Sequence, residues 1–334
     1  MMKFQKTACY LIAGIASVFL SCQNNPESPP MTTQNPDGII WSDSGWKGLF
    51  AIDMAKDTMI KVYSDYGMTA SMEVDNGDAI VGFSDGSMMK FAKSTLTAVD
   101  SCQASADSAS LSKIAINGNT IWAADNKIGR SANIIKLEKT PLKVSAVHPL
   151  RTDMCKVLGM KTSSGQIWIL CTNPPELARL DTVSFSLTNK VPLGTYMRDK
   201  GQFGLSGRTA YVLTDSCMLI KINIDAGAIV STHDLRLSMG KILDMAVSSS
   251  GVFICNKDSD TMSTVYKILN DPAVPSGTWN FAAKPMFLSA SGQRLVAVVG
   301  LGYYNRLEEI DITTMTLKRE LKKEELYCYN LAIE

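Results

Sequence analysis

The two ends of this 334-residue chain have the sequences of two halves of one repeating unit. When Asn330–Glu334 (NLAIE) is joined to Asp37–Trp41 (DGIIW), the result matches internal segments such as Lys113–Trp122 (KIAINGNTIW) and Asp244–Cys255. A unit divided between the termini is typical of a circular array of sheets, because the last strand completes the first sheet. The sequence therefore predicts a ring that is closed by pairing between the C-terminal strand and the strand at Ile39.

A turn glycine followed within about three residues by an apolar pair recurs along the whole chain. These glycines are Gly38, Gly77, Gly118, Gly165, Gly207, Gly251 and Gly292. Glycine suits tight hairpins because they often require a positive φ angle. Each unit continues with an alternating strand, such as Leu219–Asn223, and then a more polar one, such as Ala228–Ser231. We therefore expect an all-β fold, a seven-bladed β-propeller of four-stranded blades.

Other architectures share part of this pattern. Two β-sandwiches or a barrel would also give many short strands separated by turn residues. A solenoid would have polar caps at its ends and no divided unit. The segment Ala98–Leu111 interrupts the repeat and is interpreted as an extended polar insertion. In the repeated strand position, Trp41, Trp122 and Trp168 are expected to pack between blades.

Residues 1–22 resemble a secretory signal peptide, with Lys3 and Lys6 before an apolar run from Ala8 to Leu20. The run is short for a transmembrane span. The ending Phe19-Leu-Ser-Cys22 resembles a bacterial lipobox, which predicts lipidation of Cys22. An ordinary secretion signal or a buried anchor helix is the alternative.

The N-terminal segment divides the chain into three parts. Residues 23–36 are rich in Pro, Asn, Ser and Thr and are expected to form a flexible tether, and residues 37–334 form the propeller. By resemblance to lipoprotein sorting in Gram-negative bacteria, the residue after Cys22 indicates the outer membrane, with the periplasmic or surface face left open.

The charge balance bears on the class of partner. The chain has 33 basic and 32 acidic residues, for a formal charge of +1. Nucleic-acid binding requires clustered Lys and Arg, so we expect no nucleic-acid partner.

The cysteines allow two candidate disulfides in an exported protein. By the repeat register, Cys171 and Cys217 lie near the same ends of neighbouring blades, and Cys102 and Cys155 precede innermost strands of neighbouring blades. The alternative is that most of these cysteines are small buried hydrophobic residues.

Catalytic chemistry has little support in the sequence. Only two histidines occur, His148 and His233, and no zinc-type spacing or nucleotide motif is present, so we expect no catalytic residues, no metal and no cofactor. The channel opening is expected to be lined where the innermost strands begin, and Asp244 is the one carboxylate there. A bare divalent cation prefers several oxygen ligands, which disfavours a metal-dependent lactonase.

Ligands of propellers favour the loops at the channel opening. Aromatic, Arg and Asn side chains in these loops are candidates for binding, because they bury much area with few rotatable bonds. The candidate ligand-binding residues are Trp46, Asn126, Arg130, Arg198, Asp244, Tyr303, Tyr304, Asn305 and Tyr327. The alternative is that the tyrosines pack one loop against another.

Segments such as Gly207–Asp215 (GRTAYVLTD) followed by Leu219–Asp225 (LIKINID) resemble the YVTN, or YncE-like, propeller repeat, as does Gly118–Asp125. The resemblance extends over nearly the whole chain after Asp37 and implies the fold more than the function. The group includes exported binding proteins, among them surface lipoproteins that capture cobalamin.

From these observations we expect a lipid-anchored propeller that binds an unknown small molecule or envelope protein without catalysis. The alternatives are a metal-dependent hydrolase or lactonase at the channel opening, an envelope assembly scaffold, and a cobalamin-capturing surface protein.

Overall fold

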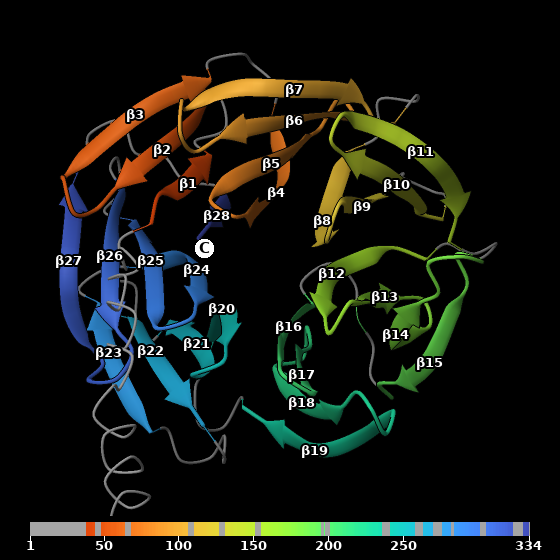
Figure 1. Ribbon diagram of the computed structural model, residues 1–334. Helices are drawn as coiled ribbons and strands as arrows, with labels where there is room; N and C mark the ends of the chain where they lie inside the picture. Colours follow the sequence, from red (N-terminus) through yellow and green to blue (C-terminus); the bar gives the residue numbers. More distant parts are fainter. Residues whose placement is uncertain are drawn as a thin grey trace, which may run out of the picture. The chain divides into compact units, whose positions relative to one another are not determined.

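Seven four-stranded antiparallel sheets surround a central axis in the computed structural model (Figure 1). The structure describes residues 38–43, 48–63, 68–105, 110–126, 131–150, 155–194, 197, 201–235, 241–257, 263–269, 276–281, 284–300, 305–322 and 330–333. The predicted signal peptide, the lipidation site Cys22 and the tether lie outside these residues. Within the described ranges, no helix is long and apolar enough to cross a membrane.

Each sheet is one blade. In the second to seventh blades the strands follow in chain order from the channel outward, and in the first blade the last strand of the chain is innermost. The first blade contains β28 (Asn330–Ala332), β1 (Ile40–Asp43), β2 (Leu49–Asp53) and β3 (Thr58–Tyr63). The second blade contains β4 (Thr69–Asp75), β5 (Asp78–Phe83), β6 (Ser87–Ala92) and β7 (Thr97–Gln103). The third contains β8 (Leu111–Asn117), β9 (Thr120–Asp125), β10 (Asn133–Lys139) and β11 (Leu142–Pro149). The fourth contains β12 (Val157–Ser163), β13 (Gln166–Thr172), β14 (Pro175–Leu180) and β15 (Leu187–Pro192). The fifth blade contains β16 (Gln202–Ser206), β17 (Thr209–Leu213), β18 (Met218–Asn223) and β19 (Ala228–Asp234). The sixth contains β20 (Lys241–Ser248), β21 (Gly251–Lys257), β22 (Ser263–Ile268) and β23 (Gly277–Phe281). The seventh contains β24 (Lys284–Ser291), β25 (Arg294–Gly300), β26 (Asn305–Asp311) and β27 (Thr316–Lys322).

The two ends of the propeller meet in the first blade, as the sequence predicts. Strand β28 pairs antiparallel with β1, with Trp41 opposite Ala332 and Asp43 opposite Asn330. In Figure 1 the blue strand β28 lies beside the red strand β1, and it contacts both β4 and β24. The innermost position of the first blade is therefore filled by the last strand of the chain, which confirms the predicted closure.

The repeated glycines form the hairpins between innermost and second strands. In the β4–β5 hairpin, Asn76 and Gly77 have φ angles of 51° and 81°, and Asp75 pairs with Asp78. Two positive φ angles in a two-residue loop are typical of a type I′ turn, whose twist matches that of the strands. Gly38 differs because its unit is divided: it precedes β1, and no hairpin is formed there.

Large apolar side chains fill the spaces between blades. Trp41, Trp122 and Trp168 are at most 2% exposed. Trp122 packs on the fourth blade, 5.5 Å from the ring of Phe185, and Trp168 packs with Phe203 of the fifth blade. These contacts confirm the predicted role of the tryptophans. Burial of such rings is a major part of the hydrophobic stabilisation.

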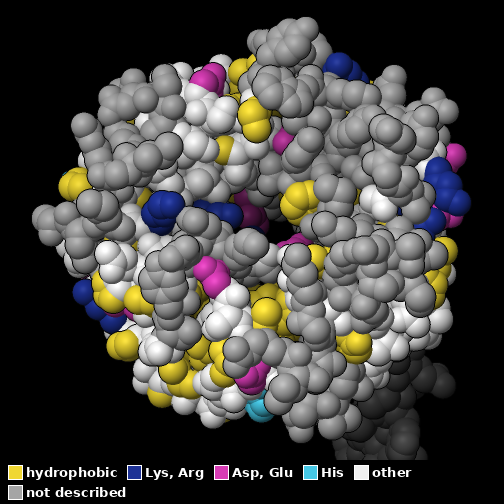
Figure 2. Space-filling view, turned by 180° about the vertical axis from the view of Figure 1, so that it is seen from behind, with side chains coloured by type: hydrophobic (Ala, Val, Ile, Leu, Met, Phe, Trp, Pro, Cys, Tyr) yellow, Lys and Arg dark blue, Asp and Glu magenta, His cyan; other side chains and the backbone are white. Residues whose placement is uncertain are grey.

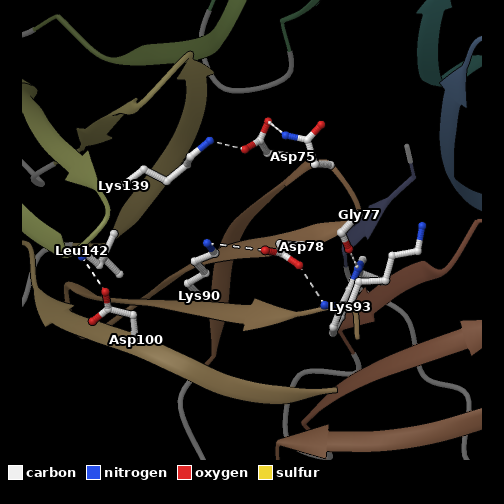
Figure 3. A network of polar contacts seen from close by, with 10 residues as sticks. Asp75, Gly77, Asp78, Lys90, Lys93, Asp100, Lys139 and Leu142 are labelled. Carbon is white, nitrogen blue, oxygen red and sulfur yellow. Dashed lines mark hydrogen bonds and ion pairs between the residues drawn. The ribbon is translucent and has the colours of Figure 1, made fainter. Parts of the chain in front are cut away.

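Polar contacts also join neighbouring blades. Figure 3 shows Asp75, at the end of β4, forming an ion pair with Lys139, at the end of β10. On the outermost strands of the same two blades, the backbone N–H of Leu142 donates to Asp100 at 2.6 Å. The carboxylate of Asp100 thereby satisfies a backbone donor at an exposed edge.

The prediction for Ala98–Leu111 was wrong in part. Most of its first half belongs to β7, the outermost strand of the second blade, which begins at Thr97. The side chains of β7 are mostly exposed, and their polarity led to the interpretation as an insertion. An outermost strand has only one neighbouring strand and faces solvent, so a polar sequence is compatible with it.

Candidate functional site

The innermost strands place equivalent residues at equal heights along the channel. In six blades the innermost and second strands form a hairpin, and the residue four positions before the last ladder residue of the innermost strand belongs to a set that we call the upper ring. In the first blade the equivalent residue is the one on β28 that pairs with Asp43. The members of the upper ring are Ser71, Lys113, Gly159, Gln202, Asp244, Phe287 and Asn330. Asp244, the carboxylate that the repeat places at the channel opening, is one of them. In the space-filling view, acidic and basic side chains border the central opening (Figure 2).

Asp244 connects three consecutive blades at the upper ring. Its Oδ1 accepts a 2.5 Å hydrogen bond from Nε2 of Gln202 in the fifth blade. Its Oδ2 accepts a 2.7 Å hydrogen bond from the backbone N–H of Leu288 in the seventh blade. The predicted candidate Asp244 therefore lies at the channel, where both carboxylate oxygens are engaged.

The channel environment changes the protonation of Asp244 and Lys113. Burial raises the pKa of Asp244 to about 6, and its hydrogen bonds and the positive charge of Lys113 oppose this increase. Burial also lowers the pKa of Lys113; repulsion from Lys161 acts in the same direction, and attraction to Asp244 opposes both. The two groups interact across the channel, and each is perturbed mainly because its charged form loses hydration.

The donor set of the upper ring suits a polar organic group. The Oε1 atom of Gln202 is buried and has no hydrogen-bond partner among the described residues, so it is available as an acceptor. Lys113 supplies a donor. A bare divalent cation would meet one carboxylate that is already engaged and a neighbouring ammonium group, which is an unfavourable combination. In the described part of the chain, no group of three or more His, Cys, Asp or Glu side chains is placed to hold a metal ion.

The loop candidates have different positions. Asn126 follows β9, and its side chain is used between blades: its Oδ1 accepts from the N–H of Val157 at 2.9 Å, and its Nδ2 donates to the carbonyl of Val157 at 2.8 Å. Asn305 begins β26 and pairs with Gly300, and the structure describes its backbone only. The remaining loop candidates, Trp46, Arg130, Arg198, Tyr303, Tyr304 and Tyr327, lie outside the described residues.

The two candidate disulfides are not formed, since Cys102 and Cys217 have free thiols. Cys102 lies on the outermost strand β7 and not before an innermost strand, so the register used to pair it with Cys155 was wrong. Cys102 packs with Ile135 and Leu137, whereas Cys155 belongs to a different cluster.

The sequence reasoning missed a second group of charges in the channel. We call the residues that follow the upper ring by two positions in each innermost strand the lower ring. Its members are Glu73, Ala115, Lys161, Gly204, Ala246, Ser289 and Ala332. Glu73 and Lys161 form an ion pair at 3.0 Å. Counting residues back from each hairpin glycine would have placed both at the same height.

Comparison with known proteins identifies the fold. No protein-family model and no curated protein matches the sequence. The β-propeller domain of Cps50 (Swd1) from Myceliophteria thermophila is 12% identical, with a TM-score of 0.55 over 76% of this chain and 86% of that one. A chain of a mitotic checkpoint complex has a TM-score of 0.59 and 11% identity over 77% of this chain and 82% of that one.

The dihydro-heme d1 dehydrogenase NirN, solved with a bound ligand, has a TM-score of 0.59 and 15% identity. The match covers 86% of this chain and 64% of the NirN chain. At such identities only the fold is shared. The protein is a seven-bladed β-propeller.

Proposed function

We propose that this protein is an exported, lipid-anchored propeller of the outer membrane that binds a protein partner on one face and catalyses no reaction. The observation that supports this most is the closure of the ring by β28 and β1. Closure ties the end of the last blade to the first blade, so the loops of each face project from a rigid framework. Rigid frameworks lower the entropy cost of binding.

The binding face in this proposal carries the loops that enter the innermost strands and the loops that join second to third strands. We refer to it as the loop face, and to the opposite face as the hairpin face. Ser84 and Asn173 are exposed residues of the loop face. Asn119 and Arg208 are exposed residues in hairpins of the opposite face. The proposal therefore predicts that Ser84 and Asn173 lie close to a bound partner and that Asn119 and Arg208 do not.

The anchor and the family are proposed from the sequence. Cys22, at the end of a lipobox-like segment, would carry the lipid, and several acyl chains contribute enough buried CH₂ groups for stable attachment. Residues 23–36 would hold the propeller away from the bilayer. The segments that resemble the YVTN repeat support this proposal, because the YVTN-like group includes exported binding proteins.

A second candidate function is capture of a small polar molecule in the channel. The observation that favours it is the upper ring, where the acceptor Oε1 of Gln202 and the ammonium group of Lys113 are both within the channel wall. Small-molecule sites typically combine a concave surface with a few polar groups that fix orientation.

Site-specific photocrosslinking in intact cells tests the principal proposal. A photoreactive amino acid at Ser84 or Asn173 is expected to give a covalent adduct with a single protein partner. The matched positions Asn119 and Arg208 are expected to give none. Adducts only from the hairpin face, or from neither face, would contradict the proposal.

The anchor has its own test. Cys22→Ser is expected to release the protein from the membrane fraction, while the circular-dichroism spectrum of the propeller stays unchanged. Continued membrane association of this variant would rule out acylation as the anchor.

A further inference from the structure

The lower ring differs from the upper ring in that all of its members are small apart from one pair of charged residues. Five of its members, the residues at 115, 204, 246, 289 and 332, are Ala, Gly or Ser. The exceptions are Glu73 on β4 and Lys161 on β12, whose side chains meet at 3.0 Å although 88 residues separate them. They reach across β8, where the small side chain of Ala115 leaves room. The Glu73–Lys161 ion pair therefore lies at a height in the channel where the other residues are small.

A pocket of about 210 Å³ opens at this ion pair. Its wall consists of Glu73, Val74, Asp75, Ala115, Ile116, Lys161 and Thr162. Drug-sized ligands occupy sites of roughly 300–1,000 Å³, so this pocket fits a smaller molecule. It lies toward the hairpin ends of β4 and β12, on the side of the channel away from the loop face.

The polar groups of the pocket differ in their availability. Asp75 is matched by Lys139 at the rim, which leaves little net charge there (Figure 3). The Oγ1 atom of Thr162 is buried and has no hydrogen-bond partner among the described residues. That hydroxyl has almost no exposed surface, so a ligand in the pocket does not contact it. Thr162 follows Lys161 in β12, and adjacent side chains of a strand point to opposite faces, so Lys161 is the donor of the pocket.

The ion pair between Glu73 and Lys161 is exchangeable. The side chains are 31% and 45% exposed. Ion pairs of this exposure contribute about 0–1 kcal/mol, because water already solvates both charges. A ligand that offers one charge of each sign can therefore separate the pair at little cost and replace it with two new contacts.

We propose that this pocket binds small α-amino acids in their zwitterionic form. The ligand carboxylate would accept a hydrogen bond from Lys161 Nζ, and the ligand ammonium group would donate to the carboxylate of Glu73. Val74, Ala115 and Ile116 complete the wall and suit a small aliphatic side chain. This site is separate from the loop face, so the inference does not depend on the proposed partner binding.

The charge balance of the pocket selects a neutral zwitterion over a simple ion. A carboxylate alone would pair with Lys161 and leave Glu73 without its cation. An amine alone would pair with Glu73 and leave Lys161 without its anion. Only a molecule with both groups forms a charged contact with each side chain, so it gains two contacts where a simple ion gains one.

Isothermal titration calorimetry of the full-length protein in detergent tests the proposal, with glycine and L-alanine as probes. Saturable binding is expected for both, and none for acetate or methylamine. Glu73→Gln and Lys161→Met should each weaken binding about tenfold or more, since each removes a charged partner.

Lys190→Met is the matched control, because Lys190 is an exposed lysine on β15 in the same blade as Lys161. It should bind the amino acids like the unmodified protein. Thermal unfolding followed by circular dichroism establishes that all variants are folded. The proposal is overturned if neither amino acid binds, if acetate or methylamine binds equally well, or if Glu73→Gln and Lys161→Met bind normally.

Discussion

Trp41 in β1 lies opposite Ala332 in β28, and its indole Nε1 donates a 2.9 Å hydrogen bond to the carbonyl of Gly77 in the β4–β5 hairpin. One residue thus takes part both in the strand pair that closes the ring and in the contact with the next blade. The closing ladder is short, since it contains three residue pairs. Its stability therefore depends on the side chains packed around it.

Removal of the closing strand should destabilise the propeller. Deletion of residues 330–334 removes the ladder with β1 and the packing of Leu331 against the cluster that contains Phe50 and Val298. We expect the free energy of unfolding in urea to fall by about 2 kcal/mol or more. Val230→Ser, at a side chain 59% exposed on β19, is the control and should change it little. Equal stability of the deletion variant would show that the closure contributes nothing.

The hydrogen bond of Trp41 can be separated from its packing. Trp41→Phe loses both ring area and the bond to Gly77. Trp168→Phe loses similar ring area, because Trp168 is equally buried, but its Nε1 has no hydrogen-bond partner among the described residues. We expect Trp41→Phe to lower the free energy of unfolding by about 1 kcal/mol more than Trp168→Phe. Equal losses in urea denaturation would assign the role of Trp41 to packing alone.

Asn126 should matter for stability and not for binding. Asn126→Ala leaves the N–H and the carbonyl of Val157 without the partners that they have in the structure. Each unsatisfied buried group costs about 1–3 kcal/mol, so we expect a loss of about 2 kcal/mol in chemical unfolding. Asn126→Asp restores only the acceptor and should be intermediate near neutral pH. Unchanged stability of Asn126→Ala would instead return Asn126 to the list of binding candidates.

Asp244 should make stability depend on pH. Its pKa is raised to about 6 in the folded protein, from an ordinary value of 3.8. Between about pH 4 and pH 6, the Asp244 carboxyl group is therefore protonated in the folded state and ionised in the unfolded state. Its contribution to the free energy of unfolding is complete below pH 4 and is lost as the pH rises through 6. The free energy of unfolding, relative to that of Asp244→Asn, should fall by about 2 kcal/mol across this window. If the difference in the free energy of unfolding between the two proteins is constant from pH 4 to pH 7, the pKa of Asp244 is not raised in the folded state.

Cys102 should react slowly with alkylating reagents. Burial, assisted by the negative charge of Asp100, raises the pKa of its thiol to about 11. The thiolate is the reactive form, so at pH 8 iodoacetamide should modify Cys102 roughly a hundredfold more slowly than an ordinary cysteine. Peptide mapping by mass spectrometry measures the rate, with protein unfolded in guanidinium as the control. Equal rates in folded and unfolded protein would show that the thiol is accessible and unperturbed.

The ring and its closure were predictable because their signals are local. A hairpin glycine such as Gly77 and an alternating strand such as Leu219–Asn223 specify structure within a few residues, and repetition of the unit specifies the rest. The position of β7 was missed because an outermost strand need not have an apolar face. Its sequence resembles that of a loop.

The channel chemistry depended on tertiary structure. Asp244 could be placed at the channel from the repeat, but its contacts with Gln202 and Leu288 come from two other blades, and its raised pKa comes from burial by the whole ring. Glu73 and Lys161 meet only because the curvature of the ring brings β4 and β12 together across Ala115. The sequence by itself determined the repeat, the number of blades and the closing strand, since local periodicity encodes them. The tertiary structure decided which charged side chains meet and what pKa Asp244 has, because both depend on packing between segments that are distant in the chain.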